Sequence, residues 1–254
     1  MLHEYVPQKE NNGSCVVFNR IMQSLHKFCV LPASLGAQQL REALVSTSND
    51  TISSLCNADI MKLSYEPVSG QFPPNPSHMR AITAALSKRV ALIQGAPGTG
   101  KTLVSGSIAK SAAAGLNTNH MRVVFAGADS NSALDNLQDS ILNAGVQSLL
   151  RCGKKDRIRK DLRSYSLGPV MQRRRQVQKC SVLCSTILGA GHKTLSDCGE
   201  IQLPFVLLDE ACEFTETSAV VVIEMGCQRL AMIGDPEQLP PVVSSAVAYQ
   251  KGTG

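Results

Sequence analysis

The sequence has no tryptophan, and aromatic residues make up only 4% of its 254 residues. No stretch reaches about 18 uninterrupted apolar residues, the length of a membrane-spanning helix, so we expect no membrane partner. Residues 1–12 are polar and lack the apolar region of a signal peptide. From these absences we expect an intracellular protein, cytoplasmic or nuclear.

The sequence also lacks the cysteine patterns of disulfide-rich and zinc-binding proteins. Nine cysteines are scattered, and the closest pair, Cys180 and Cys184, has no matching second pair or nearby histidine. We therefore expect reduced thiols and no zinc site. Hydrophobic residues make up 43% of the chain, which is ample for a core. With so few aromatics, this composition favours an aliphatic α/β sheet over a β-sandwich.

Positive charge is concentrated in one segment. The net charge is +5, but Arg151–Lys179 holds eleven Lys or Arg against Asp156 and Asp161, so the rest of the chain is slightly negative. Such a segment would attract a phosphate backbone. It is equally compatible with a solvated helix face, and Tyr165, its one aromatic residue, gives little support for base stacking.

Apolar and helical stretches alternate from residue 77 onward. The predicted strands are Val90–Ile93, Arg122–Ala126, Ser181–Ser185, Phe205–Leu208 and Arg229–Ile233. The predicted helices are Ser77–Ser87, with Ser77 as its N-cap, 102–114, 130–143, part of 157–179, and 215–224. This alternation predicts a parallel sheet with helices on both faces. Residues 1–74 are poorly defined and include part of a Pro/Gly-rich linker, so we expect the main domain over 75–254.

Residues 95–102 form the strongest motif. Their sequence, Gly-Ala-Pro-Gly-Thr-Gly-Lys-Thr, follows a predicted strand, precedes a predicted helix and satisfies the phosphate-loop pattern G-x-x-x-x-G-K-[ST]. The glycines allow the backbone to wrap around phosphate oxygens, and the helix N-terminus supplies positive potential. The predicted nucleotide-binding residues are Gly95, Pro97, Gly98, Thr99, Gly100, Lys101 and Thr102. Lys101 would contact the β- and γ-phosphates, and Thr102 would bind Mg²⁺.

Two later strands end in polar residues. Phe205–Leu208 is followed by Asp209, a candidate Mg²⁺ ligand, and Glu210, a candidate general base. Such an Asp-Glu pair can also be a helix cap at a strand end. Leu230–Gly234 leads to Gln238, whose amide would sense the γ-phosphate, although the segment could equally be a rigid proline-rich connection.

Together these motifs resemble superfamily 1 helicases, most closely the up-frameshift-type (nonsense-mediated-decay helicase-like) branch. The resemblance rests on GAPGTGKT, ADSNSALDNL at 128–137, CSTILGAGHKTL at 184–195, LLDEACEFTE at 207–216 and GDPEQLPPVV at 234–243, in the family's order. It covers roughly residues 75–250. The resemblance implies a RecA-like, P-loop NTPase domain that hydrolyses ATP with Mg²⁺ and moves on single-stranded RNA or DNA.

The resemblance also implies residue roles. Lys101, Glu210 and Gln238 would be the catalytic residues, and Thr102 and Asp209 the metal ligands. Ser130, Asn131 and Thr186 would contact the single-stranded backbone without reading sequence. The basic stretch at about 150–179 falls where the family inserts a small helical subdomain. A second RecA-like domain, which the family's motor requires, is not found in the sequence.

Three residues depart from the family pattern. His78, which the resemblance adds to the predicted nucleotide-binding residues, stands where the family has a glutamine that recognises adenine, and an imidazole cannot offer the paired donor and acceptor of an amide. Asp129 replaces a typical proline, and Glu213 replaces a glutamine near the γ-phosphate. Two alternatives stay open beside the helicase motor, the first suggested by these departures and the second by the phosphate-loop motif and the Asp-Glu strand end, which it shares. One is an ATP-dependent nucleic-acid-binding pseudo-motor without significant turnover, and the other is a hexameric AAA-type ATPase.

Overall fold

The computed structural model describes residues 21–26, 38, 40, 42, 44, 63–68, 73–116 and 121–241. Six parallel strands form one sheet in the order β1-β6-β5-β2-β4-β3. The strands are β1 (Val90–Gln94), β2 (Arg122–Ala128), β3 (Leu149–Arg151), β4 (Val182–Thr186), β5 (Gln202–Leu208) and β6 (Arg229–Gly234). The predicted α/β class with a parallel sheet is therefore confirmed.

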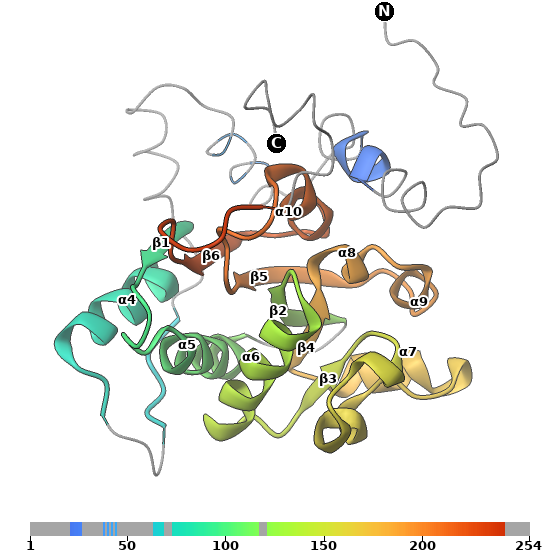
Figure 1. Cartoon of the computed structure of the whole chain (residues 1–254). Helices are drawn as coiled ribbons and strands as arrows, with labels where there is room; N and C mark the ends of the chain where they lie inside the picture. The colour runs from blue at the N-terminus through green and yellow to red at the C-terminus, as the bar shows by residue number, and fades with distance from the viewer. Residues whose placement is uncertain are drawn as a thin grey trace, which may run out of the picture.

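Helices cover both faces of this sheet. They are α4 (Pro76–Ser87), α5 (Lys101–Gly115), α6 (Asn131–Asn143), α7 (Val170–Lys179), α8 (Ile187–Ala190), α9 (Lys193–Ser196) and α10 (Glu216–Ile223). In Figure 1, α4, α5 and α6 lie on one side of the strands, and α8 and α10 lie on the other. The result is the three-layer arrangement expected for fully apolar parallel strands.

Alternate residues of each strand build two separate cores. Val124 and Ala126 of β2 face α4, α5 and α6, whereas Val123 and Phe125 face the layer of α8, α9 and α10. All four side chains are fully buried. A period of two along each strand therefore supplies both layers, which is why the strands read as continuous apolar runs.

The start of α4 differs from the sequence prediction. Asn75, and not Ser77, is the N-cap, because the Asn75 side chain accepts a hydrogen bond of 2.8 Å from the backbone N–H of His78. Pro76 occupies the first helical position, where its missing N–H costs nothing. The Ser77 hydroxyl accepts instead from the Arg80 guanidinium. Asn followed by Pro was the signal for this N-cap.

The strand β3 was not predicted. It is only three residues long, ends in a charged residue and lies at the edge of the described sheet, where it pairs with β4 and Arg151 also bridges to Ser166. Beyond it the basic segment contains two short 3₁₀ helices, Lys155–Arg157 and Lys160–Tyr165, before α7. The first residue of that segment, Arg151, thus belongs to the sheet itself.

Helices α5 and α6 pack unusually closely near the phosphate loop. A Cβ added to Gly106 would lie 2.6 Å from the backbone oxygen of Ser140, so only glycine fits there. The Ser140 hydroxyl donates a short hydrogen bond to the carbonyl oxygen of Thr102. This contact fixes the first turn of α5 against its neighbour.

Residues before the predicted main domain also contact it. The backbone N–H of Glu66 donates to the Ser111 hydroxyl of α5 at 3.0 Å, and Lys110 donates to the carbonyl oxygen of Pro67. Leu40 is fully buried in the core beneath α8, α9 and α10. Most of residues 1–62, including most of the extension defined from the sequence, lies outside the described residues.

Two findings concern the absences noted in the sequence. Within the described ranges, no helix combines the length and apolar character needed to cross a bilayer. The six cysteines of those ranges carry free thiols. Burial raises the pKa of both Cys180 and Cys184 to about 12, so these thiols stay protonated near neutral pH.

Candidate nucleotide and nucleic-acid site

The predicted site residues gather at the carboxyl edge of the sheet. Backbone hydrogen bonds tie the strand ends together: Gly95 N–H donates to Gly234 at 3.1 Å, Ala211 to Ile233 at 2.8 Å, and Asp209 to Gly127 at 2.8 Å. These bonds join the segments that leave β1, β6, β5 and β2. The phosphate loop, Asp209 and Asp235 therefore lie on one connected framework, where α/β sheets bind ligands.

The phosphate loop has a backbone that suits its glycines. Gly98 and Gly100 have φ of 75° and 84°, in the left-handed region that other residues rarely adopt. A Cβ on Gly95 would lie 2.7 Å from the Thr99 hydroxyl oxygen, whereas nothing lies within 4 Å of the Cβ position of Gly98. The loop is thus tightly packed at Gly95, whereas the space around Gly98 at its exposed tip is empty of other atoms of the described residues.

Helix α5 begins directly after the loop with a bare N-terminus. Its N-cap, Gly100, offers no side-chain cap, and no acidic residue lies in the first turn. The first backbone N–H groups therefore have no competing side-chain acceptor, as an anion site requires. The Lys101 ammonium donates to the Gly95 carbonyl oxygen at 2.9 Å, so it curls back over the loop. These features fit a phosphate group.

Asp209 lies beside the first turns of α5. The Ser105 hydroxyl donates to the Asp209 carboxylate at 3.2 Å, and Ser105 is three residues beyond Thr102 on the same helix. Burial, aided by the nearby Glu210 charge, raises the pKa of Asp209 to about 6, although Ser105 and Lys101 oppose that rise. A buried carboxylate next to a helical hydroxyl is a donor set that suits Mg²⁺.

Glu210 follows in an uncommon backbone conformation. Its φ is 51°, which is left-handed for a residue with a side chain. Such conformations cost about 1–3 kcal/mol and are often found at functional sites. The Glu213 N–H donates to the Glu210 carbonyl oxygen at 3.0 Å, which closes a tight turn after β5. At Glu210 the backbone therefore leaves the direction of strand β5.

Glu213 lies near two other acidic residues, Glu210 and Asp129. The pKa of Glu213 is raised by partial burial, then by the charges of Glu210 and Asp129. Burial also raises the pKa of Asp129, which follows β2. Glu213 therefore lies close enough to Glu210 and Asp129 for both of their charges to raise its pKa.

Gln238 is held by Asp235. Its amide nitrogen donates to the Asp235 carboxylate at 2.9 Å, and its backbone N–H donates to the Asp235 carbonyl oxygen at 3.0 Å. The side-chain bond lowers the pKa of Asp235, with smaller contributions from the Glu237 N–H and the Lys101 charge. Gln238 is exposed, whereas Asp235 is buried.

His78 contacts the phosphate loop directly. Its Nε2 lies 2.8 Å from the Thr99 carbonyl oxygen. Because that oxygen can only accept, Nε2 must carry the hydrogen. A Cβ on Gly100 would lie 3.0 Å from the same nitrogen, so the ring packs on the loop at its second left-handed glycine. His78 thus donates its Nε2 hydrogen to the backbone of the phosphate loop.

The three predicted nucleic-acid contacts lie after neighbouring strands. Thr186 ends β4 and is opposite Ala128, the last residue of β2. Ser130 is the N-cap of α6, where its hydroxyl accepts from the Ala133 N–H at 3.1 Å and pairs with the Ser132 hydroxyl. Asn131 is the first residue of α6. The structure therefore brings all three to one part of the carboxyl edge.

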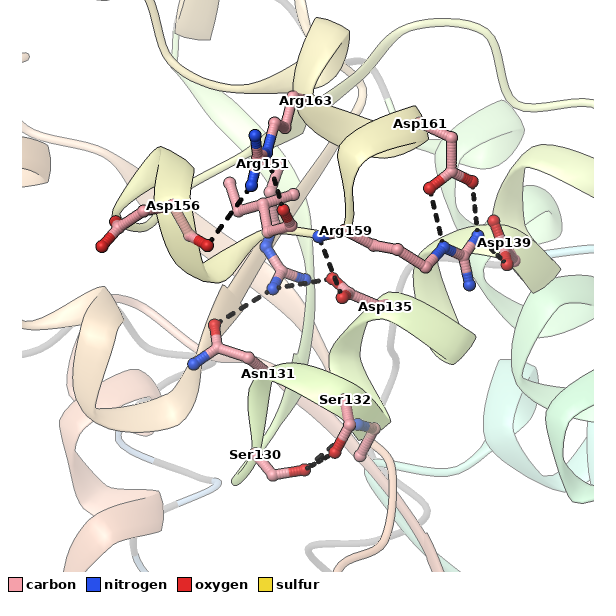
Figure 2. Close-up of polar contacts among 12 residues, drawn as sticks. Ser130, Asn131, Ser132, Asp135, Asp139, Arg151, Asp156, Arg159, Asp161 and Arg163 are labelled. Atoms are coloured by element: carbon pink, nitrogen blue, oxygen red, sulfur yellow. Dashed lines mark hydrogen bonds and ion pairs between the residues drawn. The ribbon is translucent and has the colours of Figure 1, made fainter.

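Asn131 is also part of a buried polar network, which Figure 2 shows. The Arg151 Nη2 of β3 donates to the Asn131 side-chain oxygen at 3.2 Å and forms an ion pair with Asp135 at 3.1 Å. The Arg159 N–H donates to the other Asp135 oxygen, and the Arg159 side chain pairs with Asp139 and Asp161. Two arginines of the basic segment are thus engaged with α6.

Sequence reasoning missed three residues of this site: Ser105, Asp235 and Arg151. Ser105 had a usable signal, since it is polar and lies one turn after Thr102 in an apolar helix. Asp235 directly follows a strand, as Asp209 does. For Arg151 no sequence signal existed, because its partner Asn131 lies twenty residues earlier along the chain.

The fold and the site define a P-loop nucleotide-binding domain: a parallel α/β sheet with a glycine-rich loop leading into an uncapped helix beside a buried aspartate. A family model described as an AAA domain matches residues 73–179 and 170–246. The chain belongs to this family, and it carries the first RecA-like domain of a superfamily 1 helicase of the up-frameshift type.

Curated relatives are consistent with this assignment. The ATP-dependent helicase upf1 of Schizosaccharomyces pombe is 28% identical over 66% of this chain and 22% of its own length. The regulator of nonsense transcripts 1 homolog of Drosophila melanogaster is 24% identical over 94% of this chain and 23% of its own length. The helicase SEN1 of Saccharomyces cerevisiae is 43% identical over a shorter stretch, 26% of this chain and 3% of its own length. The chain thus spans about a fifth of the length of its long-matching relatives.

Solved structures are similar at lower identity. The UvsW helicase of bacteriophage T4 matches with a TM-score of 0.47 at 13% identity, covering 74% of this chain and 34% of that chain.

Proposed function

We propose that this chain is the ATP-binding motor domain of a superfamily 1 helicase, which hydrolyses ATP to drive movement on single-stranded RNA or DNA as part of the complete motor. The hydrogen bond between Ser105 and Asp209 carries the proposal, because it joins the helix that follows the phosphate loop to the carboxylate after β5. In P-loop NTPases the Mg²⁺-binding hydroxyl and aspartate come from these two elements.

The chain's own groups account for nucleotide binding. Loop N–H groups and the bare N-terminus of α5 would bind the phosphate oxygens, with the Lys101 ammonium leaving Gly95 for the β- and γ-phosphates. Thr102 and Asp209 would hold Mg²⁺, which neutralises charge on the phosphates when bound. Gln238, oriented by Asp235, would contact the γ-phosphate.

Glu210 is the candidate general base. Its place after Asp209 brings it next to the proposed phosphate site, and its left-handed backbone turns it off the strand. It would accept a proton from the water that attacks the γ-phosphate. Glu213 adds negative charge beside it, and Asp129 adds negative charge beside Glu213. That charge favours a positively charged group from another part of the complete motor.

Ser130, Asn131 and Thr186 would contact the phosphates of a single strand that crosses the ends of β2 and β4. Neutral donors at a helix N-terminus suit backbone contacts that do not read sequence. The exposed cations of the basic segment, among them Lys154 and Lys155, would add salt-dependent attraction.

Nucleotide titration tests the proposal. Wild-type chain and the Lys101→Ala variant are titrated with ATP and Mg²⁺ in a calorimeter, and we expect the variant to lose affinity roughly 10- to 100-fold, as for lost hydrogen bonds to charged groups. Lys110→Ala is the matched control, since it removes the same charge from the far part of α5. Equal affinity of Lys101→Ala and wild type would refute the nucleotide site.

Phosphate release separates the motor from the alternatives. The protein in its complete form should release phosphate faster when single-stranded RNA or DNA is added, and Glu210→Gln should abolish that release while keeping ATP affinity. No stimulation in the presence of tight binding would instead favour the pseudo-motor, and a nucleotide-dependent hexamer in native mass spectrometry would favour the AAA-type ATPase.

A further inference from the structure

The amide of Asn131 has only one orientation that its surroundings permit. Its side-chain oxygen accepts a hydrogen bond from Arg151 Nη2 at 3.2 Å. A guanidinium has five N–H donors and no acceptor, so an amide NH₂ group could not face it. The amide nitrogen of Asn131 must therefore face away from Arg151, and Asn131 is only half-buried. Arg151 thus selects which end of the amide is left for other partners.

Arg151 itself has little freedom to do anything else. Its side chain is completely buried. One nitrogen, Nη2, serves both Asn131 and Asp135, whereas Nε and Nη1 have no hydrogen-bond partner among the described residues. A buried donor without a partner costs about 1–3 kcal/mol, and a buried ion pair is weak evidence for stability. The contacts of Arg151 therefore orient Asn131 and Asp135 but add little to the stability of the fold.

The partners of Arg151 lie on one face of α6. Asn131, Asp135 and Asp139 are spaced four residues apart, so they form one stripe along the helix. Arg151 holds the first two, while Arg159 binds Asp135 through its backbone N–H and Asp139 through its side chain. Figure 2 shows this stripe facing the basic segment. The N-terminus of α6 is thereby fixed relative to the edge strand β3.

We propose that Arg151 is a positioning residue for nucleic-acid binding: by binding the oxygen of Asn131, it presents the amide N–H groups of Asn131 to the phosphates of the single strand. This inference rests on the proposed function of the α6 N-terminus. Arg151 is buried and does not touch the nucleic acid. Its role is to make Asn131 a donor and to prevent its carbonyl oxygen from facing a phosphate.

The test is the affinity for a fluorescein-labelled single-stranded oligouridylate, measured by anisotropy with the full chain. The main variant is Arg151→Met with Asp135→Asn, which removes both charges of the buried pair, leaves the net charge unchanged and keeps an acceptor for the Arg159 N–H. We expect affinity to fall about 5- to 10-fold, the loss of roughly one hydrogen bond. Asn131→Ala should produce a similar loss.

Combining the changes distinguishes orientation from general damage. If Arg151 acts through Asn131, adding Asn131→Ala to the double variant should cause almost no further loss, because coupled residues are not additive. Asn131→Asp keeps a partner for Arg151 but places a carboxylate where the N–H groups were, so it should bind more weakly than Asn131→Ala. A purely structural role for Arg151 would give additive losses and would also lower the thermal midpoint in parallel.

Arg159→Met is the control for the loss of an arginine cation from the basic segment. It removes one cation from the same segment but leaves the contact between Arg151 and Asn131 in place. Its effect should be small and should disappear at high salt, whereas the effect of the double variant should persist.

The failure of this inference differs from the failure of the proposed function. If wild type binds no oligonucleotide, the nucleic-acid part of the proposed function fails and the inference falls with it. If Asn131→Ala weakens binding but the Arg151 and Asp135 double variant binds like wild type, only the role of Arg151 is overturned. If Asn131→Ala binds like wild type, the amide is not a contact and the inference is also wrong.

Discussion

At the scale of single residues, Asp209 combines the position proposed for a metal ligand with an unfavourable charge. Its folded-state pKa of about 6 lies above the ordinary value of 3.8. Between these two pH values the Asp209 carboxyl is ionised in the unfolded chain but still protonated in the folded chain. Folding stability from this group is therefore present below pH 3.8 and is lost as the pH rises through 6.

Asp209→Asn should consequently stabilise the protein. At pH 7.5 in EDTA, the gain in the free energy of unfolding should approach about 3 kcal/mol, the equivalent of a two-unit pKa difference. The asparagine oxygen can still accept from Ser105. Urea unfolding at pH 7.5 and at pH 4 measures this, and the gain should nearly vanish at pH 4. An equal gain at both pH values would mean that the charge of Asp209 is not its source.

His78 poses a question of selectivity at the same scale. Because its Nε2 hydrogen binds the Thr99 carbonyl oxygen, we expect His78 to support the phosphate loop more than it reads a base. His78→Ala should weaken ATP and GTP binding by a similar factor of about 5 to 10, the worth of one hydrogen bond. His78→Gln should recover part of the loss, since its amide N–H can reach the same carbonyl.

Parallel titrations with the two nucleotides decide between these roles. A loss in His78→Ala that is confined to ATP would instead identify the histidine as a reader of adenine.

At the scale of elements, the contact between α5 and α6 determines how the first turn after the phosphate loop is held. Replacing glycine with alanine in a helix interior usually stabilises the helix by up to about 1 kcal/mol. Here the added Cβ would lie 2.6 Å from the Ser140 backbone oxygen, so the helices must separate. We expect a net destabilisation of about 1–3 kcal/mol in urea unfolding.

Gly115→Ala provides the comparison on the same helix. The added Cβ would meet the end of the Leu63 side chain, at 2.5 Å, and that side chain can rotate. This variant should remain close to wild type. If Gly106→Ala were equally neutral, the close approach of α5 and α6 would not be a rigid feature of the fold.

The strands also show which parts of the fold the sequence alone predicts. Five of the strands were predicted because each is an apolar run, and Asp209 and Glu210 followed because they directly succeed one of them. The strand β3 was not, since its three residues end in a buried arginine that no hydrophobic pattern reveals. The Ser105–Asp209 bond joins residues 104 positions apart, and spacing along the chain does not tell which side chains will face each other.

At the scale of the whole molecule, the uneven charge predicts a specific salt dependence. Each cation that neutralises a phosphate of a single strand contributes about 0.7 to the slope of log affinity against log salt. Lys154→Gln with Lys155→Gln should therefore reduce the slope by about 1.4, because both side chains are exposed in the basic segment. Anisotropy titrations between low and physiological salt measure this slope.

A second charge-matched variant locates the effect. Lys88→Gln with Lys110→Gln removes two cations away from the carboxyl edge, at the end of α4 and in the far part of α5. It should leave the slope nearly unchanged. The same decrease in both double variants would show that net charge, and not the basic segment, governs attraction.

Strand β1, which leads into the phosphate loop, is an edge strand of the described sheet. Among the described residues β1 hydrogen-bonds to β6 alone, and Leu92 in its middle is 76% exposed. Half of its peptide groups therefore have no ladder partner within the described part of the chain, and its amide hydrogens should exchange with solvent deuterium sooner than those of β5 and β2. Ligand seated on the loop would slow that exchange, which makes β1 a natural reporter of nucleotide occupancy.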